Sequence, residues 1–420
     1  MKSQEIIAGL DIGSTAIRVA VGERIGTSEG KDQLHIVGAV EVPSEGVSKG
    51  SVTSLENTVS CLSKAIEKAE RMTGLPIGSA WVGIGGSHII AQESKGVVGV
   101  SRSDGEIREE DVDRAIDAAR TVATPANYEI LHVIPKGFTV DGERGIKDPV
   151  GMTGIRLEVD AVIVQGLSSQ IKNLTKSVYR TGIDIDDLVF SILAASEAVV
   201  TERQKELGVC VVNIGASLTS LAVFEEGDVL HTAVLPLGAD HITSDIAIGL
   251  RTSLDVAEGV KLGAGTALSE SVGRKDEVNL SLYGAPEDER VMRRYVAEII
   301  EARVEEIFEK IDEELVRCGR SGMLPSGVVI TGGGAKLNGM LDVAKKRLRL
   351  PASLGIPMGV STVIDRVKDP AMATAVGLVA WGNMIARTQG RPKLGSLFAK
   401  FAIMEDLRGG IVKWLKALKP

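Results

Sequence analysis

The feature that most limits the fold is a hairpin motif that occurs twice in the chain. The segments IIAGLDIGSTAIRVAVGE, from Ile6, and VCVVNIGASLTSLAVFEEG, from Val209, each place β-branched residues on both sides of a glycine corner. This pattern predicts a strand, a tight turn and a second strand. Asn213 aligns without gaps with Asp11, 202 residues earlier. Such a long repeat predicts two similarly folded halves whose glycine corners face one ligand across a cleft.

A third glycine corner, at 332–334, follows the apolar run GVVIT. Main-chain N–H groups at such corners can converge on phosphate oxygens, because glycine lacks Cβ and permits close approach. Asp11 is the only acid at a corner, and a carboxylate there suits Mg²⁺ held through water. Arg18, on the return strand, is placed to reach the phosphates. One glycine corner alone is more often an ordinary turn, so the prediction depends on all three.

The segments between these corners indicate further α/β structure. Apolar residues at helical spacing predict helices at 55–72, 109–120, 240–263 and 292–318. Residues 87–162 differ from the rest of the chain in their sequence pattern, which predicts short strands, a helix that starts on acidic residues and loops rich in Gly and Pro. We therefore expect an inserted subdomain. The apolar run 159–165 is expected to be a buried strand that returns to the first half.

Composition excludes several classes of protein. The 420 residues include 48 basic and 56 acidic side chains, a net charge of −8, and only 3% are aromatic, which argues against a nucleic-acid partner. The sequence shows no secretory signal. The uncharged, Ala- and Gly-rich run Ala371 to Ala386 is shorter than the ~20 residues of a membrane-spanning helix, so a buried core helix is expected. Neither the cysteines nor the histidines show metal-site spacing.

The order of these motifs resembles that of the actin/Hsp70/hexokinase ATPase superfamily. The resemblance implies an α/β, actin-like two-lobed ATPase fold with duplicated ribonuclease H-like domains. It identifies five motifs: phosphate-1 at 11–18, connect-1 at 194–198, phosphate-2 at 213–217, the adenosine motif at 330–336 and connect-2 at 369–378. The two connect motifs would be crossing helices at which the lobes hinge.

The whole chain is most similar to the FtsA family of bacterial division proteins. Three stretches carry this resemblance, ELGV from Glu206, LPLGADH from Leu235 and TSDIAIGL from Thr243, and GSHI from Gly86 would open an FtsA-type 1C insert. The implied layout is subdomain 1A at 1–86, 163–195 and 360–388; 1C at 87–162; 2A at 196–240 and 308–359; 2B at 241–307; a linker at 389–402; and an amphipathic helix at 403–420.

The family resemblance also implies a set of nucleotide-binding residues. Asp11 would hold Mg²⁺, and the ATP-binding residues would be Gly13, Ser14, Thr15, Arg18, Asn213, Gly215, Ala216, Gly238, Glu258, Lys261, Gly332, Gly333, Gly334 and Lys336. Glu258 and Lys261 match an E-x-x-K pattern that faces the ribose, and their spacing puts both on one helical face. By spacing alone they would be an ordinary surface ion pair. Lys336 would lie against adenine.

Several positions depart from the superfamily pattern. In phosphate-2, Asn213 replaces the usual aspartate, and Ala216 and Ser217 replace glycines. Ser191 stands where hydrolases carry a water-positioning Glu or Gln, and Arg18 replaces the more usual lysine while keeping its charge. Losing a metal-supporting group typically costs ~10–100-fold in metal affinity or activity. We therefore expect ATP to be bound but hydrolysed slowly or not at all. Complete loss of ATP binding is the alternative.

The last residues predict a short amphipathic helix. Apolar and basic side chains alternate at helical spacing, with Ile411, Trp414, Leu415 and Leu418 on one face and Lys413, Lys416 and Lys419 off it. After a polar linker, such a helix suits the plane of an anionic membrane. Docking on the protein's own core or in a groove of a partner is the alternative.

The resemblance implies a division protein that binds ATP, polymerises and tethers the FtsZ ring to the membrane. Its implied partners are FtsZ, further copies of itself, an anionic membrane surface and other division proteins that bind subdomain 1C. Its implied location is cytoplasmic, peripheral on the inner face of the cell membrane at the division site. The alternatives are a pilus-assembly scaffold related to this family, a sugar or acyl kinase of the same superfamily, and an Hsp70-like chaperone.

Overall fold

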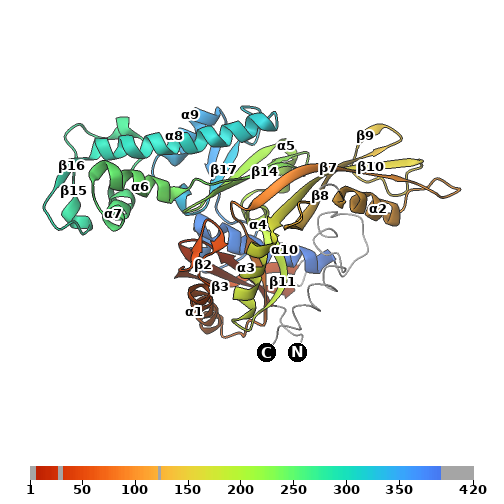
Figure 1. Ribbon diagram of the computed structural model, residues 1–420, viewed down its shortest axis with the longest axis horizontal. Coiled ribbons are helices and arrows are strands. Elements are labelled where there is room, and N and C mark those ends of the chain that lie inside the picture. Colours follow the sequence, from red (N-terminus) through yellow and green to blue (C-terminus); the bar gives the residue numbers. More distant parts are fainter. Residues whose placement is uncertain (1–5, 27–31, 122–123, 389–420) are drawn as a thin grey trace. The chain divides into compact units, whose positions relative to one another are not determined.

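The computed structural model describes residues 6–26, 32–121 and 124–388, which form two compact units. The larger unit holds the described residues up to 90 together with 169–380 (Figure 1). The smaller unit holds those of 91–168 together with the end of the last helix, from Trp381. The predicted linker and amphipathic helix at 389–420 lie outside the described residues. The predicted division into four subdomains stays a prediction.

The larger unit contains two five-stranded sheets with the same strand order. The first has the order β11-β6-β1-β2-β3, with β1 Ile6–Ile12, β2 Ala16–Gly26, β3 Asp32–Pro43, β6 Ser79–Ile84 and β11 Asp184–Phe190. The second has the order β18-β17-β12-β13-β14, with β12 Val209–Ile214, β13 Thr219–Glu225, β14 Asp228–Leu235, β17 Val328–Thr331 and β18 Ala352–Leu354. In each, an antiparallel three-stranded meander adjoins two parallel strands. The predicted repeat is confirmed.

The two repeated hairpins also share their register. Asp11 lies opposite Arg18 in the first, and Asn213 lies opposite Ser220 in the second, which are the same pairs 202 residues apart. Each turn is closed by an equivalent bond, because the N–H of Gly13 donates to the Ala16 carbonyl at 3.0 Å and that of Gly215 donates to the Leu218 carbonyl at 2.8 Å. Both glycine corners therefore have the same backbone construction.

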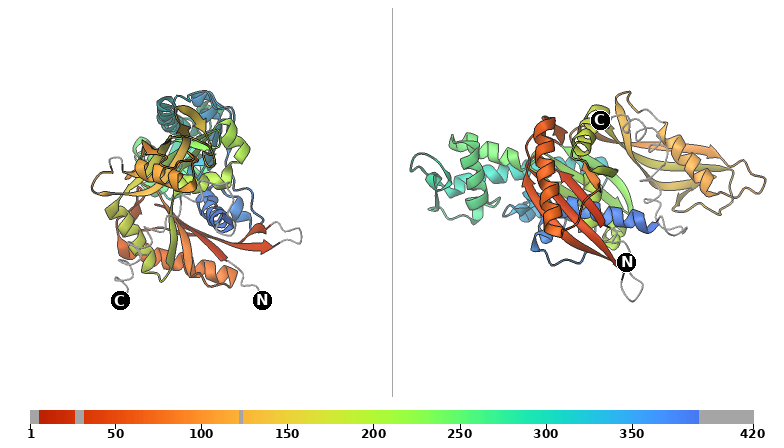
Figure 2. Two further views of the ribbon diagram at one scale, coloured as in Figure 1. Left: turned by 90° about the vertical axis from the view of Figure 1, so that its right-hand side faces the viewer. Right: turned by 90° about the horizontal axis from the view of Figure 1, so that it is seen from below.

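Helices cover these sheets as the apolar spacing predicted, with one difference. Helix α1, Leu55–Thr73, packs on β2 and β3 (Figure 2), and α8, Arg293–Arg317, packs on α6 and α9. The predicted helix at 240–263 is two helices, α6 Ala239–Leu250 and α7 Leu254–Ala264. The break falls at Arg251, which adopts a left-handed φ of 54°, and Ser253 caps the second helix.

The remaining elements of the larger unit connect the sheets or lie beside them. The other helices are α3 Ser168–Tyr179, α4 Ser191–Val199, α5 Glu202–Leu207, α9 Met340–Leu348 and α10 Ala373–Thr388. Short strands are β4 Val47–Ser48, β5 Ser51–Val52, β15 Glu277–Asn279 and β16 Arg290–Met292, and short 3₁₀ helices are η1 Ser269–Ser271, η2 Leu280–Tyr283, η3 Gly333–Lys336, η4 Asp365–Lys368 and η5 Pro370–Met372.

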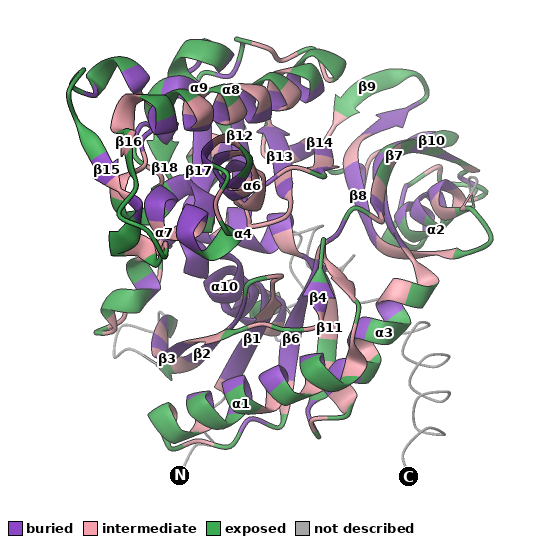
Figure 3. Ribbon diagram, turned by 60° about the vertical axis from the view of Figure 1, so that its left-hand side comes forward, coloured by how far each residue is buried: buried purple, intermediate pink, exposed green. Residues whose placement is uncertain are grey.

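Helices α4 and α10 cross at main-chain contact distance. A Cβ atom on Gly377 of α10 would lie 1.8 Å from the carbonyl oxygen of Ala194 in α4, and one on Gly9 of β1 would lie 2.4 Å from the carbonyl of Ala375. Both helices are mostly buried (Figure 3). The predicted crossing of connect-1 and connect-2 is thus present, and glycine is required because no side chain fits between the backbones.

The smaller unit is a four-stranded sheet covered on one face by α2, Glu109–Arg120. Its strand order is β7-β10-β8-β9, with β7 Ile89–Gly99, β8 Tyr128–Val140, β9 Glu143–Ile146 and β10 Arg156–Leu167. The segment 159–165 is a buried strand, but it pairs with β8 in this sheet and does not return to the first half. Much of the stretch expected to be loop is β8, where the register shifts beside Pro135, a residue typical of bulges.

Helix α10 contains most of the long uncharged run. Ala375, Val376, Leu378 and Val379 are fully buried, as expected of a core helix. Over the described residues, no helix combines the length and the hydropathy that a membrane crossing requires.

A Gly377→Ala substitution tests the helix crossing. Alanine in place of glycine inside a helix normally stabilises it by up to ~1 kcal/mol. Here the added methyl group must separate two backbones, so the free energy of unfolding should fall by about 1–3 kcal/mol. Urea unfolding measures the change. Gly78→Ala is the control, because its Cβ would meet nothing within 4 Å. A stabilised Gly377→Ala chain would contradict the crossing.

Candidate nucleotide site

The phosphate-1 corner brings together an acid and a base that the sequence analysis selected. Asp11 near the end of β1 and Arg18 on β2 lie directly opposite one another, with Arg18 Nη1 4.0 Å from Asp11 Oδ2. Arg18 Nη1 also lies 3.9 Å from the position that a Cβ on Gly13 would occupy. The Arg18 guanidinium therefore borders the glycine corner, while its Nε donates to Glu41 Oε2 at 2.7 Å. Its predicted contact with phosphates stays a prediction.

Burial gives the Asp11 carboxyl an unusual proton affinity. Its side chain is 17% exposed, and burial raises its pKa from 3.8 to about 6, against the opposing charge of Arg18. The charge of Arg18 does not fully compensate the cost of burying the ionised Asp11 carboxylate, so a further cation beside it would stabilise the ionised form. The site thus fits the predicted role of Asp11 as an indirect ligand of Mg²⁺. Among the described residues, no three His, Cys, Asp or Glu side chains gather as a metal centre.

The phosphate-2 corner is fixed by a neighbouring helix start. The N–H of Ala239 donates to the Gly215 carbonyl at 2.9 Å, and the N–H of Asp240 donates to the Ala216 carbonyl at 2.8 Å. A Cβ on Gly238 would lie 2.4 Å from the Ala216 carbonyl. Gly238 therefore lies against this corner, and its predicted role in nucleotide binding stays a prediction.

Asn213 joins the second half of the molecule to α10. Its Nδ2 donates to Thr374 Oγ1 at 3.2 Å, and Thr374 is buried. The next residue on α10, Ala375, packs against Gly9 of β1. Adjacent residues of one helix turn thus contact both repeated hairpins. Thr374 was not predicted as a site residue, since nothing in its local pattern distinguishes it from other helix residues.

The adenosine motif packs against phosphate-2. A Cβ on Gly332, whose φ is 86°, would lie 2.2 Å from Asn213 Oδ1, and one on Gly334 would lie 2.5 Å from Ile214 Cγ2. A Cβ on Gly333 would meet nothing within 4 Å. The motif is therefore held on both sides by glycines that permit close packing, while Gly333 between them faces open space.

A cavity of about 440 Å³ adjoins this motif. It is lined by Glu41, Lys336, Asp365, Arg366, Lys368, Asp369, Pro370 and Met372. Lys336 Nζ lies 2.9 Å from Asp369 Oδ2. Burial alone would raise the pKa of Asp369, but the bond from Lys336 and the N–H of Ala371 outweigh it and lower that pKa. The predicted adenine-contacting lysine thus stands at a cavity wall, paired with the first residue of connect-2.

Glu258 and Lys261 form an ion pair at 2.6 Å, with Lys261 buried. Lys261 Nζ also donates to Thr243 Oγ1 at 2.8 Å and to the Ala239 carbonyl at 3.2 Å. The pair thus fastens α7 to the start of α6, and its predicted contact with a ribose stays a prediction.

Ser191, the first residue of α4, lies beside the end of β6 in the first sheet. Its Oγ is 3.0 Å from the position of a Cβ on Gly83 and 3.5 Å from that on Gly85, a glycine that follows β6. Thr374 Cγ2 lies 3.5 Å from the same Gly83 position. Ser191 is therefore close to connect-2, but its short side chain bonds neither Asn213 nor Asp11 among the described contacts.

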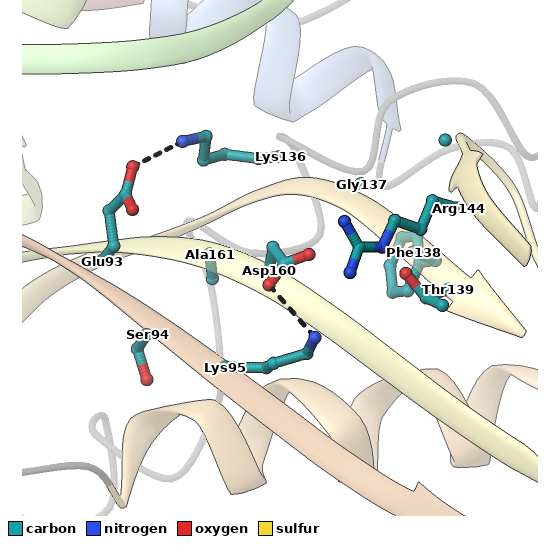
Figure 4. A pocket seen from close by; sticks show the side chains of 11 residues that line it. Glu93, Ser94, Lys95, Lys136, Gly137, Phe138, Thr139, Arg144, Asp160 and Ala161 are labelled. Carbon is teal, nitrogen blue, oxygen red and sulfur yellow. Dashed lines mark hydrogen bonds and ion pairs between the residues drawn. The ribbon is translucent and has the colours of Figure 1, made fainter. Parts of the chain in front are cut away.

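The smaller unit has a second cavity, of about 460 Å³, on its sheet (Figure 4). Its charged lining is mixed, with Lys136 bonded to Glu93 at 2.6 Å and Lys95 3.8 Å from Asp160. The sequence analysis selected none of these residues.

Two family models match the chain. One, described as the SHS2 domain inserted in FTSA, matches residues 86–165, and the other, described as cell division protein FtsA, matches residues 210–377.

Three curated relatives match almost the whole chain, and each is described as cell division protein FtsA. The relative from Bacillus subtilis is 40% identical over 405 residues, covering 96% of this chain and 89% of the relative. The relative from Pseudomonas aeruginosa is 38% identical over 382 residues, covering 91% and 90%. The relative from Escherichia coli K12 is 33% identical over 387 residues, covering 90% and 91%.

Solved structures confirm the predicted actin-like fold. A chain of the PilM–PilN type IV pilus biogenesis complex matches with a TM-score of 0.63 at 17% identity, covering 90% of this chain and 98% of that one. MreB5 of Spiroplasma citri bound to AMPPNP matches with a TM-score of 0.56 at 12% identity, covering 92% and 98%. At these low sequence identities the matches show a shared fold and nothing about function.

An Asp11→Asn substitution tests the buried carboxyl. With a folded pKa of about 6 against 3.8, the folded chain holds the proton more tightly than the unfolded chain, so stability is lost as pH rises through this window. Asparagine removes this loss and should raise the free energy of unfolding by up to about 3 kcal/mol at about pH 8, with little change at about pH 4. Urea unfolding of the ligand-free chain at both pH values measures the effect, and exposed Glu67→Gln is the control.

Proposed function

Because the chain belongs to the FtsA family of cell division proteins, we propose that it binds ATP with Mg²⁺ between its two repeated halves and polymerises in the ATP-bound state. It is an actin-like division protein, and its work is mechanical. ATP favours the closed arrangement of the halves because it binds that arrangement preferentially.

The open space at Gly333 is the observation that best supports ATP binding. The motif around Gly333 is tightly packed, so a glycine that faces nothing within 4 Å is suited to a ligand lying on its backbone. The N–H groups of Gly13 and Gly215 close their own turns, so the main-chain N–H groups of the residues that follow them would be the ones offered to phosphates, and Arg18 adds positive charge. Mg²⁺ near Asp11 would neutralise phosphate charge, with water and phosphate oxygens as its other ligands. MreB5, which shares the fold, is described bound to AMPPNP and to ADP.

Slow or absent hydrolysis is supported by the contacts of Asn213 and Ser191. The Asn213 amide carries no charge to a metal or to water, and its Nδ2 is engaged by Thr374. Ser191 is too short to orient an attacking water from the start of α4. The chain would therefore use ATP chiefly as a structural ligand.

Assembly and attachment complete the proposal. MamK, whose chain matches with a TM-score of 0.50, is described as a double helical filament, which supports polymerisation of this fold. The terminal helix at 403–420 would anchor each subunit at the inner membrane face, and arraying many weak anchors along a polymer makes attachment firm. The filament would tether the FtsZ ring there, while the cavity-bearing sheet of the smaller unit is a candidate surface for other division proteins.

A Gly333→Val substitution tests the ATP site. The added side chain enters open space, so the fold should be unaffected, whereas ATP affinity should fall at least about tenfold because the ligand loses its approach to the backbone. Calorimetric titration with Mg²⁺ and ATP measures this. Gly78→Val is the control, because Gly78 is equally open but precedes β6, whereas the site lies at the far ends of the strands. Unchanged affinity in Gly333→Val would refute the site.

Deleting Ile411–Pro420 tests the membrane anchor. The apolar face and Lys413 and Lys416 would be lost, each lysine contributing ~1 kcal/mol near an anionic surface. Sedimentation with vesicles that contain anionic lipid should fall to background, while ATP binding stays as in the full chain. Undiminished sedimentation would remove the anchor from the proposal and favour docking of the helix on protein.

A further inference from the structure

A row of three charged side chains crosses the first sheet beside the phosphate-1 corner. Asp11 on β1 lies opposite Arg18 on β2, and Arg18 lies opposite Glu41 on β3. Directly opposite residues of adjacent antiparallel strands project to the same face of a sheet, so the three side chains form one line. The equivalent positions in the second half hold the uncharged residues Asn213, Ser220 and Val234. The charged row thus belongs to the first half alone.

The two edges of the Arg18 guanidinium have different surroundings. Its Nε donates to Glu41 Oε2 at 2.7 Å, whereas Nη1 lies 4.0 Å from Asp11 and beside the Gly13 corner. The Arg18 side chain is only 16% exposed. The carboxylate of Glu41 therefore holds one edge of the guanidinium, and the other edge lies beside the Gly13 corner and Asp11.

Glu41 is itself held in place at the end of β3. Lys68 Nζ, from α1, donates to its main-chain carbonyl at 3.1 Å, and Arg366 Nη1 lies 3.9 Å from its Oε1. The side chain also lines the 440 Å³ cavity that contains Lys336. Glu41 thus connects the charged row to the segment that leads into connect-2. Nothing in its local sequence pattern indicates this position.

We infer that Glu41 is a positioning residue for the nucleotide phosphates, which it serves by holding Arg18 in a phosphate-facing orientation. The inference rests on the proposed ATP binding. A free arginine side chain loses much rotamer freedom when it is ordered on a ligand, and this loss weakens binding. Glu41 orders the guanidinium beforehand through a charge-assisted bond, leaving the Nη edge for phosphate oxygens.

Affinities for ATP, ADP and adenosine, measured by calorimetric titration, test this role. Glu41→Ala should bind ATP and ADP about tenfold more weakly, with a much smaller change for adenosine, because only phosphates meet Arg18. Glu41→Gln should recover most of the loss, since its amide oxygen still accepts from Nε. Arg18→Ala should lose at least as much, and the double variant Arg18→Ala/Glu41→Ala should be no weaker than Arg18→Ala. Glu67→Ala and Glu67→Gln, at an exposed position of α1, are the charge-matched controls.

Several outcomes would overturn the inference. Equal losses for adenosine and ATP, or losses that add in the double variant, would make Glu41 a general structural residue. A gain of ATP affinity in Glu41→Ala would mean that Glu41 competes with phosphate for Arg18. Unchanged ATP affinity in Glu41→Ala would refute this inference but leave the proposed ATP binding standing. Failure of the unsubstituted chain to bind ATP refutes the proposed function and this inference together.

Discussion

The larger unit depends on the main-chain contact between α10 and its surroundings. Gly377 lets the helix lie against the Ala194 carbonyl of α4, and Gly9 admits the Ala375 carbonyl to β1. Thr374, which directly precedes Ala375 in α10, accepts a hydrogen bond from Asn213 of β12. A single helix turn thereby links both repeated hairpins, and contacts between backbones leave little room for adjustment. The arrangement of the glycine corners follows from this packing.

The two halves share a backbone plan but not their side chains. The first half carries Asp11, Arg18 and Glu41 in one row, whereas the second has Asn213 in the position of Asp11. Charge is thus concentrated at one corner, and the other corner is used for packing against Gly332 and α10. Of the two equivalent rows, only the first thus presents charged side chains beside its glycine corner.

Local sequence patterns predicted secondary structure most accurately where the element depends only on nearby residues, as in a single helix or a tight turn. The helix at 109–120 has the expected bounds, and both hairpin turns are closed as expected. The helix expected at 240–263 is broken at Arg251, whose left-handed conformation local apolar spacing does not indicate. The strand at 159–165 was assigned to the wrong sheet, because a buried apolar run does not specify its partner strand. The residues that line the cavity of the smaller unit form no recognisable motif in the sequence, so they were not predicted as a site.

By itself the sequence determined the repeat, the glycine corners, the helical segments and the family, because these depend on local patterns and on motif order. Tertiary structure alone decided that Glu41 holds Arg18, that Thr374 meets Asn213 across 161 residues of chain, and that Lys261 is buried against α6. Strand register and helix crossing set these contacts, and both arise from packing among distant segments, which no local window of sequence encodes.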